Sequence, residues 1–160
     1  MEECYGVLCD KRLPARLKGK VYQMVLRPAL LYGSECWPIK KIQVQRLMAT
    51  EMRMIRWMGG YTRMDRIMNE VIRDWVKVAP IKDKMRQIRL RWFDLVKRSE
   101  GALVRSYERI NASVSKRGSG RPKNSLNEVI REDLKVVGLI EDMARDRRLW
   151  QDRIKVLDIR

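Results

Sequence analysis

A run of cations directly before a helix start is the part of this sequence best suited to bind an anion. Its members are Lys116, Arg117, Arg121 and Lys123. No acidic residue lies between 116 and 123, and Ser125 and Glu128 then have the spacing of a helix capping box. Backbone N–H groups at a helix N-terminus attract anions, so this arrangement favours phosphate over a neutral ligand. A solvated basic linker is the alternative, and the sequence leaves both open.

A second group of cations lies on the helix that Pro80 is expected to start. Its members are Lys82, Arg86, Arg89, Arg91, Lys97 and Arg98. Helical spacing places them largely off the apolar face, where they can follow a phosphate backbone or form a solvated surface. Both interpretations stay open, and a strongly positive net charge supports the first.

The sequence excludes several kinds of catalytic and metal chemistry. It has no histidine, so His-dependent triads and His general bases are excluded. Its three cysteines, Cys4, Cys9 and Cys36, cannot complete a four-ligand zinc site within the chain. We therefore predict no catalytic residue, no metal, no cofactor and no small-molecule substrate.

The acidic residues are scattered and form no recognisable catalytic set. Those considered as candidates are Glu35, Glu51, Asp65, Asp94 and Asp146. Cations outnumber acids in this chain, so ion pairing is the expected role of these side chains.

Composition points to a folded and strongly basic protein. The chain has 160 residues, with 36 Lys and Arg against 20 Asp and Glu, and a formal net charge of +16. A pI near 10.3 is typical of nucleic-acid binders, with anionic membrane surfaces as the main competing partner. With 45% hydrophobic residues, the chain is too apolar for a disordered basic tail.

The sequence lacks the features of a secreted or membrane-spanning protein. No apolar run approaches the roughly 20 residues of a membrane span. The start Met1-Glu2-Glu3-Cys4 lacks the charge and the apolar core of a signal peptide. The odd number of cysteines fits a reducing compartment, so we expect the nucleus or the cytoplasm and no membrane partner.

Apolar spacing predicts a mainly α fold, an irregular bundle of about five to six helices. The expected helices cover 14–31 with an interruption near Pro28, 40–58 ended by Gly59-Gly60, 69–76, a long helix from Pro80, 125–137 ended by Gly138, and 140–157. One short strand is expected over 103–110. The apolar face of the helix after Pro80 is expected to contain Ile81, Met85, Ile88, Trp92, Leu95 and Val96.

Several short motifs occur in the order in which they occur in a known family. They are Leu17-Lys18-Gly19-Lys20-Val21-Tyr22, Arg27-Pro28-Ala29-Leu30-Leu31-Tyr32-Gly33-Ser34-Glu35-Cys36-Trp37, Glu51-Met52-Arg53-Met54-Ile55-Arg56-Trp57-Met58, Arg63-Met64-Asp65-Arg66-Ile67, Val78-Ala79-Pro80-Ile81, Arg89-Leu90-Arg91-Trp92-Phe93, Gly120-Arg121-Pro122-Lys123 and Asp146-Arg147-Arg148-Leu149-Trp150. From about Gly6 onward the chain resembles the C-terminal part of LINE-type (non-LTR) retrotransposon reverse transcriptases, especially plant ones. The order that these motifs share with the family makes the resemblance specific.

The resemblance implies a region that follows the catalytic palm. In that family, polymerisation depends on palm aspartates that hold two Mg²⁺ ions, and these lie upstream of the Leu31–Glu35 region. This chain has no Asp-Asp dipeptide, and two-metal phosphoryl transfer needs converging carboxylates, so no polymerisation is expected. The chain departs from the family after Phe93, where relatives commonly have Gly-His-Val and this chain has Asp94-Leu95-Val96.

The resemblance and the composition together divide the chain into four segments. Residues 1–37 would be the remnant of the reverse transcriptase domain end with a thumb helix, and 38–100 a helical basic region. Residues 101–124 would be a basic Gly/Ser-containing linker, and 125–160 a C-terminal helical hairpin. Without a palm, the apolar side of 14–37 would lose its usual partner, so we expect exposed apolar surface and self-association there.

Two tryptophans and a stretch similar to an AT-hook support nucleic-acid binding less strongly than the cations do. Trp57 and Trp92 are able to stack on bases, but both fit helical apolar patterns and are expected in the core. The Ser119–Pro122 stretch is similar to an AT-hook, except that Ser119 replaces the first arginine of the core, which removes half of the minor-groove contacts.

Two functional classes stay open. The first is a non-catalytic, nucleic-acid-binding C-terminal fragment of a LINE-type reverse transcriptase that contacts RNA or DNA backbone without sequence readout. The second is a decayed or repurposed transposon-derived helical protein with an interaction role or no function. A start at Met1 without a palm favours the second class.

Overall fold

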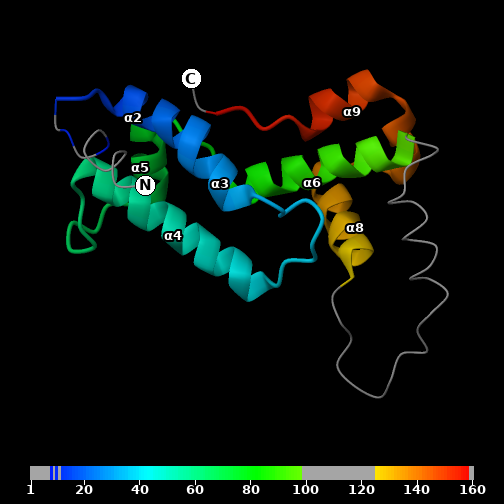
Figure 1. Cartoon of the computed structure of the whole chain (residues 1–160), viewed down its shortest axis with the longest axis horizontal. Helices are drawn as coiled ribbons and strands as arrows, with labels where there is room; N and C mark the ends of the chain where they lie inside the picture. Colours follow the sequence, from blue (N-terminus) through cyan, green and yellow to red (C-terminus); the bar gives the residue numbers. More distant parts are fainter. Residues whose placement is uncertain (1–7, 9, 11, 99–124, 159–160) are drawn as a thin grey trace, which may run out of the picture. The chain divides into compact units, whose positions relative to one another are not determined.

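The computed structural model describes residues 8, 10, 12–98 and 125–158 (Figure 1). The predicted linker over 101–124, the strand predicted within it and its cations lie outside these residues. Within the described residues the fold is all-α and contains no strand, so the predicted fold class is confirmed.

The described helices form two compact units. In chain order they are α2 (Ala15–Val21), η1 (Tyr22–Leu26, π-helical), α3 (Arg27–Leu31), α4 (Lys41–Gly59), α5 (Asn69–Val76), α6 (Ile81–Arg98), α8 (Leu126–Val137), η2 (Glu141–Arg145, 3-10) and α9 (Arg147–Ile154). Unit 1 takes in 1–32, 39–85 and 156–160, and unit 2 takes in 33–38 and 86–155.

Local sequence sets most helix ends where the spacing predicted them. Gly60 and Gly138 adopt left-handed conformations with φ of 72° and 71°, which glycine tolerates because it has no Cβ. Ser125 and Glu128 exchange the two hydrogen bonds of a capping box, each 3.2 Å long. The boundaries of α5 match the predicted 69–76 as well.

The interruption of the α-helix predicted near Pro28 is confirmed. It is a wider turn of the helix and not a break in the chain's helical course. Residues 15–31 run as one helical course through α2, η1 and α3. The N–H of Arg27 donates to the carbonyl of Tyr22, five residues earlier. Because proline has no N–H and its ring crowds the preceding turn, a π-helical turn before Pro28 accommodates it.

The single helix predicted over 140–157 is wrong. The segment contains two short helices, η2 and α9, with Asp146 between them. The Asp146 carboxylate accepts hydrogen bonds of 3.0 and 3.2 Å from two backbone N–H groups in the first turn of α9. An aspartate in this extended conformation caps a new helix and does not continue the old one.

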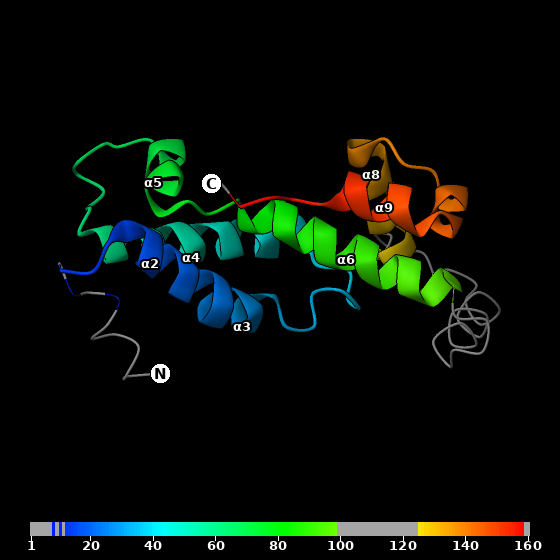
Figure 2. The same cartoon turned by 90° about the horizontal axis from the view of Figure 1, so that it is seen from above.

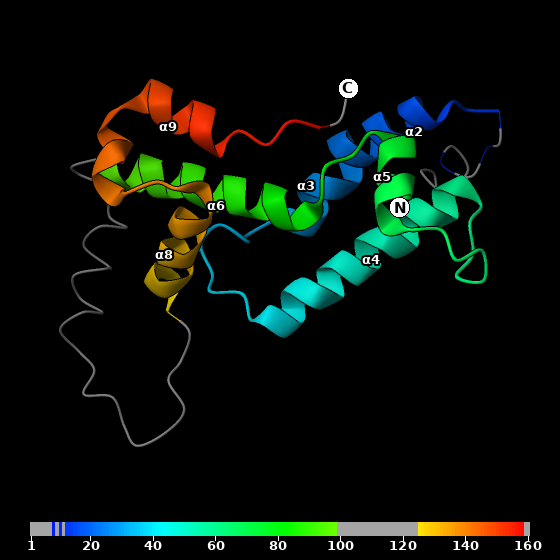
Figure 3. The ribbon, with the colours of Figure 1, turned by 180° about the vertical axis from the view of Figure 1, so that it is seen from behind.

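The core of unit 1 lies between α4, α5 and the course of α2 and η1. Its most buried members include Tyr22, Ile55, Ile72 and Val76. α5 packs against both α2 and α4, as the rear view shows (Figure 3). These contacts place the N-terminal turn of α5 beside the C-terminal half of α4, which is where the candidate site described below is formed.

Unit 1 covers part of the apolar surface that was expected to be exposed near 14–37. Tyr22 and Leu31 are buried. Leu17, Met24 and Val25 remain 43%, 78% and 49% exposed. The residues expected to be exposed were Leu17, Val21, Met24, Leu30 and Leu31. Leu17 and Met24 are exposed, whereas Val21 and Leu30 are half-buried and Leu31 is buried, so the expectation is confirmed only in part. The self-association that such a surface would support stays a prediction.

The core of unit 2 shows that the predicted apolar face of α6 is partly wrong. Leu90 and Phe93 are buried, whereas Leu95 is 63% exposed. The Phe93 ring stacks on Trp150 of α9 with centroids 6.1 Å apart, and the Trp150 indole N–H donates to the Leu90 carbonyl at 3.2 Å. Within unit 2, α9 runs alongside α6 (Figure 2), so packing against Trp150 decides which side of α6 is buried.

Two residues of the Leu17–Tyr22 motif hold α2 against its neighbours. The buried Lys18 ammonium donates to the carbonyl of Met58 at 2.8 Å, near the C-terminal end of α4 where a cation is favourable. Gly19 lies so close to α5 that a Cβ added there would be 2.0 Å from the Val76 carbonyl oxygen. This motif therefore has a structural role in unit 1.

Gly19→Ala is expected to destabilise the protein, because α2 or α5 must move to admit the methyl group. Overpacking of this kind costs about 1–3 kcal/mol. Urea unfolding followed by circular dichroism measures the change, with the exposed neighbour Lys20→Ala as the control, expected within about 0.5 kcal/mol of the parent. Equal stability of Gly19→Ala and the parent would contradict the close approach of α2 to α5.

Candidate nucleic-acid interface

Two of the predicted α6 cations hold α6 to α8 within unit 2. Arg89 is buried, and its Nε and Nη2 atoms both lie 2.7 Å from Asp133 Oδ2. Arg86 lies 3.7 Å from the other oxygen of Asp133. Burial raises the pKa of Asp133, and the charges of Arg89 and Arg86 oppose that rise. A guanidinium held in this way is not available to a phosphate.

Two further α6 cations have acidic partners, and two do not. Arg98 pairs with the buried Asp94, and Lys97 lies 3.4 Å from Glu141. Lys82 and Arg91 are exposed, and neither has an ion pair with another described residue. Of the six predicted α6 cations, Lys82 and Arg91 are thus the most open to phosphate.

The cations of the predicted basic loop cannot be placed. Lys116, Arg117, Arg121 and Lys123 lie outside the described residues, so their role stays a prediction. The helix start that follows them is described and carries the predicted capping box.

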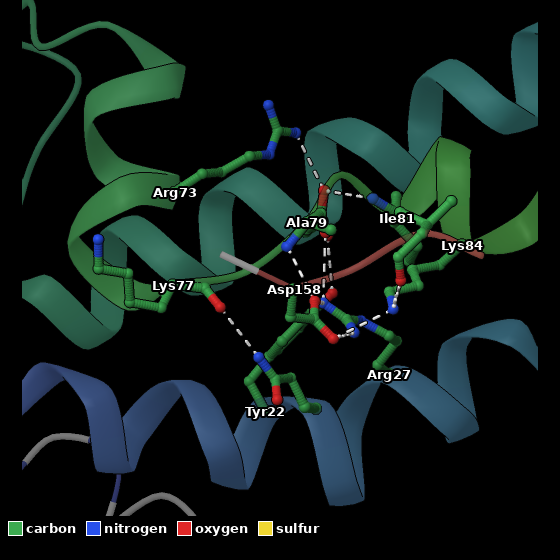
Figure 4. Close-up of polar contacts among 11 residues, drawn as sticks. Tyr22, Arg27, Arg73, Lys77, Ala79, Ile81, Lys84 and Asp158 are labelled. Carbon is green, nitrogen blue, oxygen red and sulfur yellow. Dashed lines mark hydrogen bonds and ion pairs between the residues drawn. The ribbon is translucent and has the colours of Figure 1, made fainter. Parts of the chain in front are cut away.

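A buried carboxylate joins three segments of unit 1. Glu51 of α4 is fully buried, and its Oε1 accepts the Tyr22 hydroxyl at 3.0 Å. Its Oε2 accepts Arg73 at 3.0 Å and the backbone N–H of Ile81, at the start of α6, at 3.3 Å. Figure 4 shows the bonds from Arg73 and Ile81 meeting at one oxygen atom. Burial and the Glu51 charge raise the pKa of Tyr22 above its ordinary value, so the phenol stays protonated.

A second carboxylate fixes the C-terminal segment within unit 1. Asp158 accepts two bonds from Arg27, at 2.9 and 3.0 Å, and one from the Ala79 N–H at 2.9 Å. Lys84 lies 3.1 Å from it and also donates to the Val156 carbonyl at 2.6 Å (Figure 4). Burial favours the neutral acid, but the bonds from Arg27 and Ala79 outweigh it and hold the pKa of Asp158 below its ordinary value.

The ion pairing expected of the acids is confirmed for two of them and wrong for two others. Glu51 and Asp94 pair with arginines. Asp65 instead accepts the backbone N–H and the hydroxyl of Thr62, at 2.6 and 3.0 Å, and Asp146 caps α9. Short acidic side chains at turns bind nearby N–H groups in preference to a distant cation.

The described part of unit 1 contains an open pocket of about 630 Å³, here called the arginine pocket. Its lining comes from the second half of α4, the loop after it and the first turns of α5, namely Met48, Ala49, Met52, Arg53, Arg56, Trp57, Tyr61, Arg63, Asn69, Glu70 and Arg73. The lining combines four arginines with two aromatic rings and a single carboxylate. This combination suits an anion that also carries a flat apolar group.

Two of these arginines hold the pocket together, and the other two face solvent. Arg73 pairs with Glu51, and Arg56 donates to the Ile67 carbonyl at 2.7 Å and to the Asn69 side chain at 3.0 Å. Arg53 and Arg63 are exposed and form no ion pair with any residue that the structure describes. Arg53 and Arg63 are therefore the residues of the pocket able to meet a ligand phosphate.

Trp57 was expected in the core, and this prediction is wrong. Its side chain is 43% exposed and lines the arginine pocket. Trp92 is half-buried against the core of unit 2, as expected.

Sequence reasoning did not single out the arginine pocket. Arg53 and Trp57 are four residues apart on a helix, so they share a face. Gly59-Gly60 then turns the chain back along that face, which brings Tyr61 and Arg63 beside it. The spacing and the turn were both visible in the sequence, whereas the closure of the pocket by α5 was not.

Comparisons with protein-family models, curated proteins and solved structures found no match to this chain. Among the described residues, no group of three acidic, cysteine or histidine side chains is placed to hold a metal ion. No described helix is both long enough and apolar enough to span a membrane.

Asp158→Asn is expected to lower stability at pH 7. A carboxylate with a depressed pKa stabilises the fold above its unfolded pKa, about 3.9, and that stabilisation is lost as the pH falls through the lower folded value. The urea midpoint of the variant should lie below that of the parent at pH 7, and the gap should close below about pH 4. The exposed Asp152→Asn is the control. A gap that is independent of pH would contradict the role given to the Asp158 charge.

Proposed function

We propose that this chain is a non-catalytic, nucleic-acid-binding C-terminal fragment of a LINE-type reverse transcriptase. Its cations contact the phosphate backbone of RNA or DNA without reading sequence. No polymerase activity is proposed, because the chain has no Asp-Asp dipeptide of the kind on which polymerisation in that family depends. The motifs quoted above support the family, and the charge of the chain supports the binding role.

The surplus of surface cations is the observation that carries the proposal. With 36 cations and 20 acids, at least 16 cations have no acid to pair with one to one. Among the described residues, Lys18, Arg27, Arg73 and Arg89 are the buried cations, and each already has a partner. Exposed cations that lack an ion pair among the described residues, such as Lys82, Arg91, Arg53 and Arg63, are therefore the ones accessible to phosphates.

An interaction role is the second candidate. Leu17, Met24 and Val25 form an exposed apolar surface on α2 and η1, and such surfaces favour association. The same alternative includes a decayed transposon-derived copy that has no function. Binding to nucleic acid distinguishes the candidates.

The proposal predicts salt-dependent binding with little dependence on sequence. If six or so phosphates are neutralised, log K should fall with log salt at a slope of about −4 to −6. Replacing Arg117, Arg121 and Lys123 together by Ala should make the slope shallower by about two to three units and weaken all sequences about equally. Fluorescence anisotropy with labelled duplexes of unrelated sequence measures both quantities.

A triple variant with the same loss of charge provides the control. Arg131, Arg145 and Lys155 are exposed cations outside the proposed interface, and their replacement by Ala should change the slope less. Equal effects of the two triple variants would mean that the loop has no special role. An absence of binding in low salt would contradict the proposed function.

A further inference from the structure

We propose that the arginine pocket binds an unpaired nucleotide of single-stranded nucleic acid. The base would lie against Trp57 and Tyr61, and its phosphates against Arg53 and Arg63. The ligand class rests on the proposed function. The site is a different one, since its described lining takes no residue from α6.

The size and the lining of the pocket fit this ligand. Its volume of about 630 Å³ lies within the roughly 300–1,000 Å³ typical of small-molecule sites. The aromatic rings and the thioethers of Met48 and Met52 offer polarisable surface to a flat base. Stacking of this kind accepts any base, which agrees with binding that does not read sequence.

The pocket is held in shape before a ligand arrives. The Tyr61 ring meets Trp75 edge-on at 5.7 Å, and the Tyr61 N–H donates to the Arg56 carbonyl at 2.9 Å. Gly59 makes room for this ring, because a Cβ there would lie 2.6 Å from it. The bonds of Arg56 and Asp65 fix the loop that follows. A site that is already ordered loses little entropy on binding.

The charge of the pocket selects an anion. Arg73 is neutralised by Glu51, and Arg56 keeps its charge but is held by loop carbonyls, so Arg53 and Arg63 are the exposed cations of the lining. Glu70 is the opposing carboxylate in the lining. The face of α4 continues this surface, since the exposed Arg46 lies seven residues before Arg53. A phosphate chain is therefore attracted along α4 to the pocket.

A concave pocket discriminates between a single strand and a duplex. The bases of a duplex are stacked on each other and are not accessible to a ring inside a pocket, whereas an unpaired base is. We therefore expect this site to add affinity for single strands beyond the backbone contacts, which both forms share.

The test compares three ligands with the same label on the full chain, namely a strand of eight thymidines, the same strand with abasic sites in place of the bases, and a duplex. Trp57→Ala should weaken binding of the thymidine strand by about 5- to 100-fold, because one stacked base is lost. It should change binding of the abasic strand by less than about 2-fold. Arg53→Ala with Arg63→Ala should weaken both strands and make the salt slope shallower by about 1.4 units.

Two matched variants control for the loss of a ring or a charge elsewhere. Trp37 is 70% exposed and lies outside the pocket, so Trp37→Ala should leave binding of the thymidine strand within about 2-fold of the parent. Arg153→Ala removes one exposed charge outside the lining and away from α4, and it should affect all three ligands equally. Trp57→Phe keeps a ring and should retain most of the affinity that Trp57→Ala loses.

The outcomes separate this inference from the proposed function. Two results would overturn the pocket proposal and leave the proposed backbone binding intact. One is a folded Trp57→Ala variant that binds the thymidine strand as tightly as the parent, and the other is an equal loss of affinity for the thymidine and abasic strands. Where Trp57→Ala does not fold, unchanged thymidine binding by the variant with Arg53→Ala and Arg63→Ala overturns the pocket proposal. Failure of the parent to bind any of the three ligands overturns the proposed function and this inference together.

Discussion

The buried carboxylate of Glu51 is the interaction on which unit 1 depends. A charge removed from water must be fully partnered, and Glu51 takes its partners from η1, α5 and the N-terminus of α6. Loss of this carboxylate would leave Arg73 buried without its counter-charge, at a cost of about 3–5 kcal/mol. α4 and α5 are thereby held together at the point where their exposed surfaces form the arginine pocket.

The cations of this protein divide into two groups by what they contact. Arg27, Arg73 and Arg89 each bind a carboxylate from a distant part of the chain and serve the fold. Arg53 and Arg63 face solvent beside aromatic rings and have no acidic partner among the described residues. A high net charge alone does not distinguish the groups. The position of each carboxylate does, and it explains why α6 offers fewer cations to a phosphate than its sequence indicates.

Features that depend on neighbours in sequence were predictable, and features that depend on distant packing were not. The ends at Gly60 and Gly138 and the cap at Ser125 follow from local chemistry. The burial of Leu90 instead of Leu95 follows from Trp150, which lies on another helix. Arg89 was predicted to meet phosphate because Asp133 was not known to lie beside it. Trp57 was assigned to the core for the same reason, since its helical spacing does not show that its side chain is 43% exposed.

Photo-crosslinking tests the central claim, that outward-facing cations and rings of this chain bind nucleic acid, most directly. A single strand containing 5-iodouridine, irradiated with the full chain and analysed by peptide mass spectrometry, reports which residues lie against the bases. Adducts are predicted at Trp57 or Tyr61, with none at the buried Trp150. Adducts confined to other surfaces, or an absence of adducts at low salt, would contradict this claim.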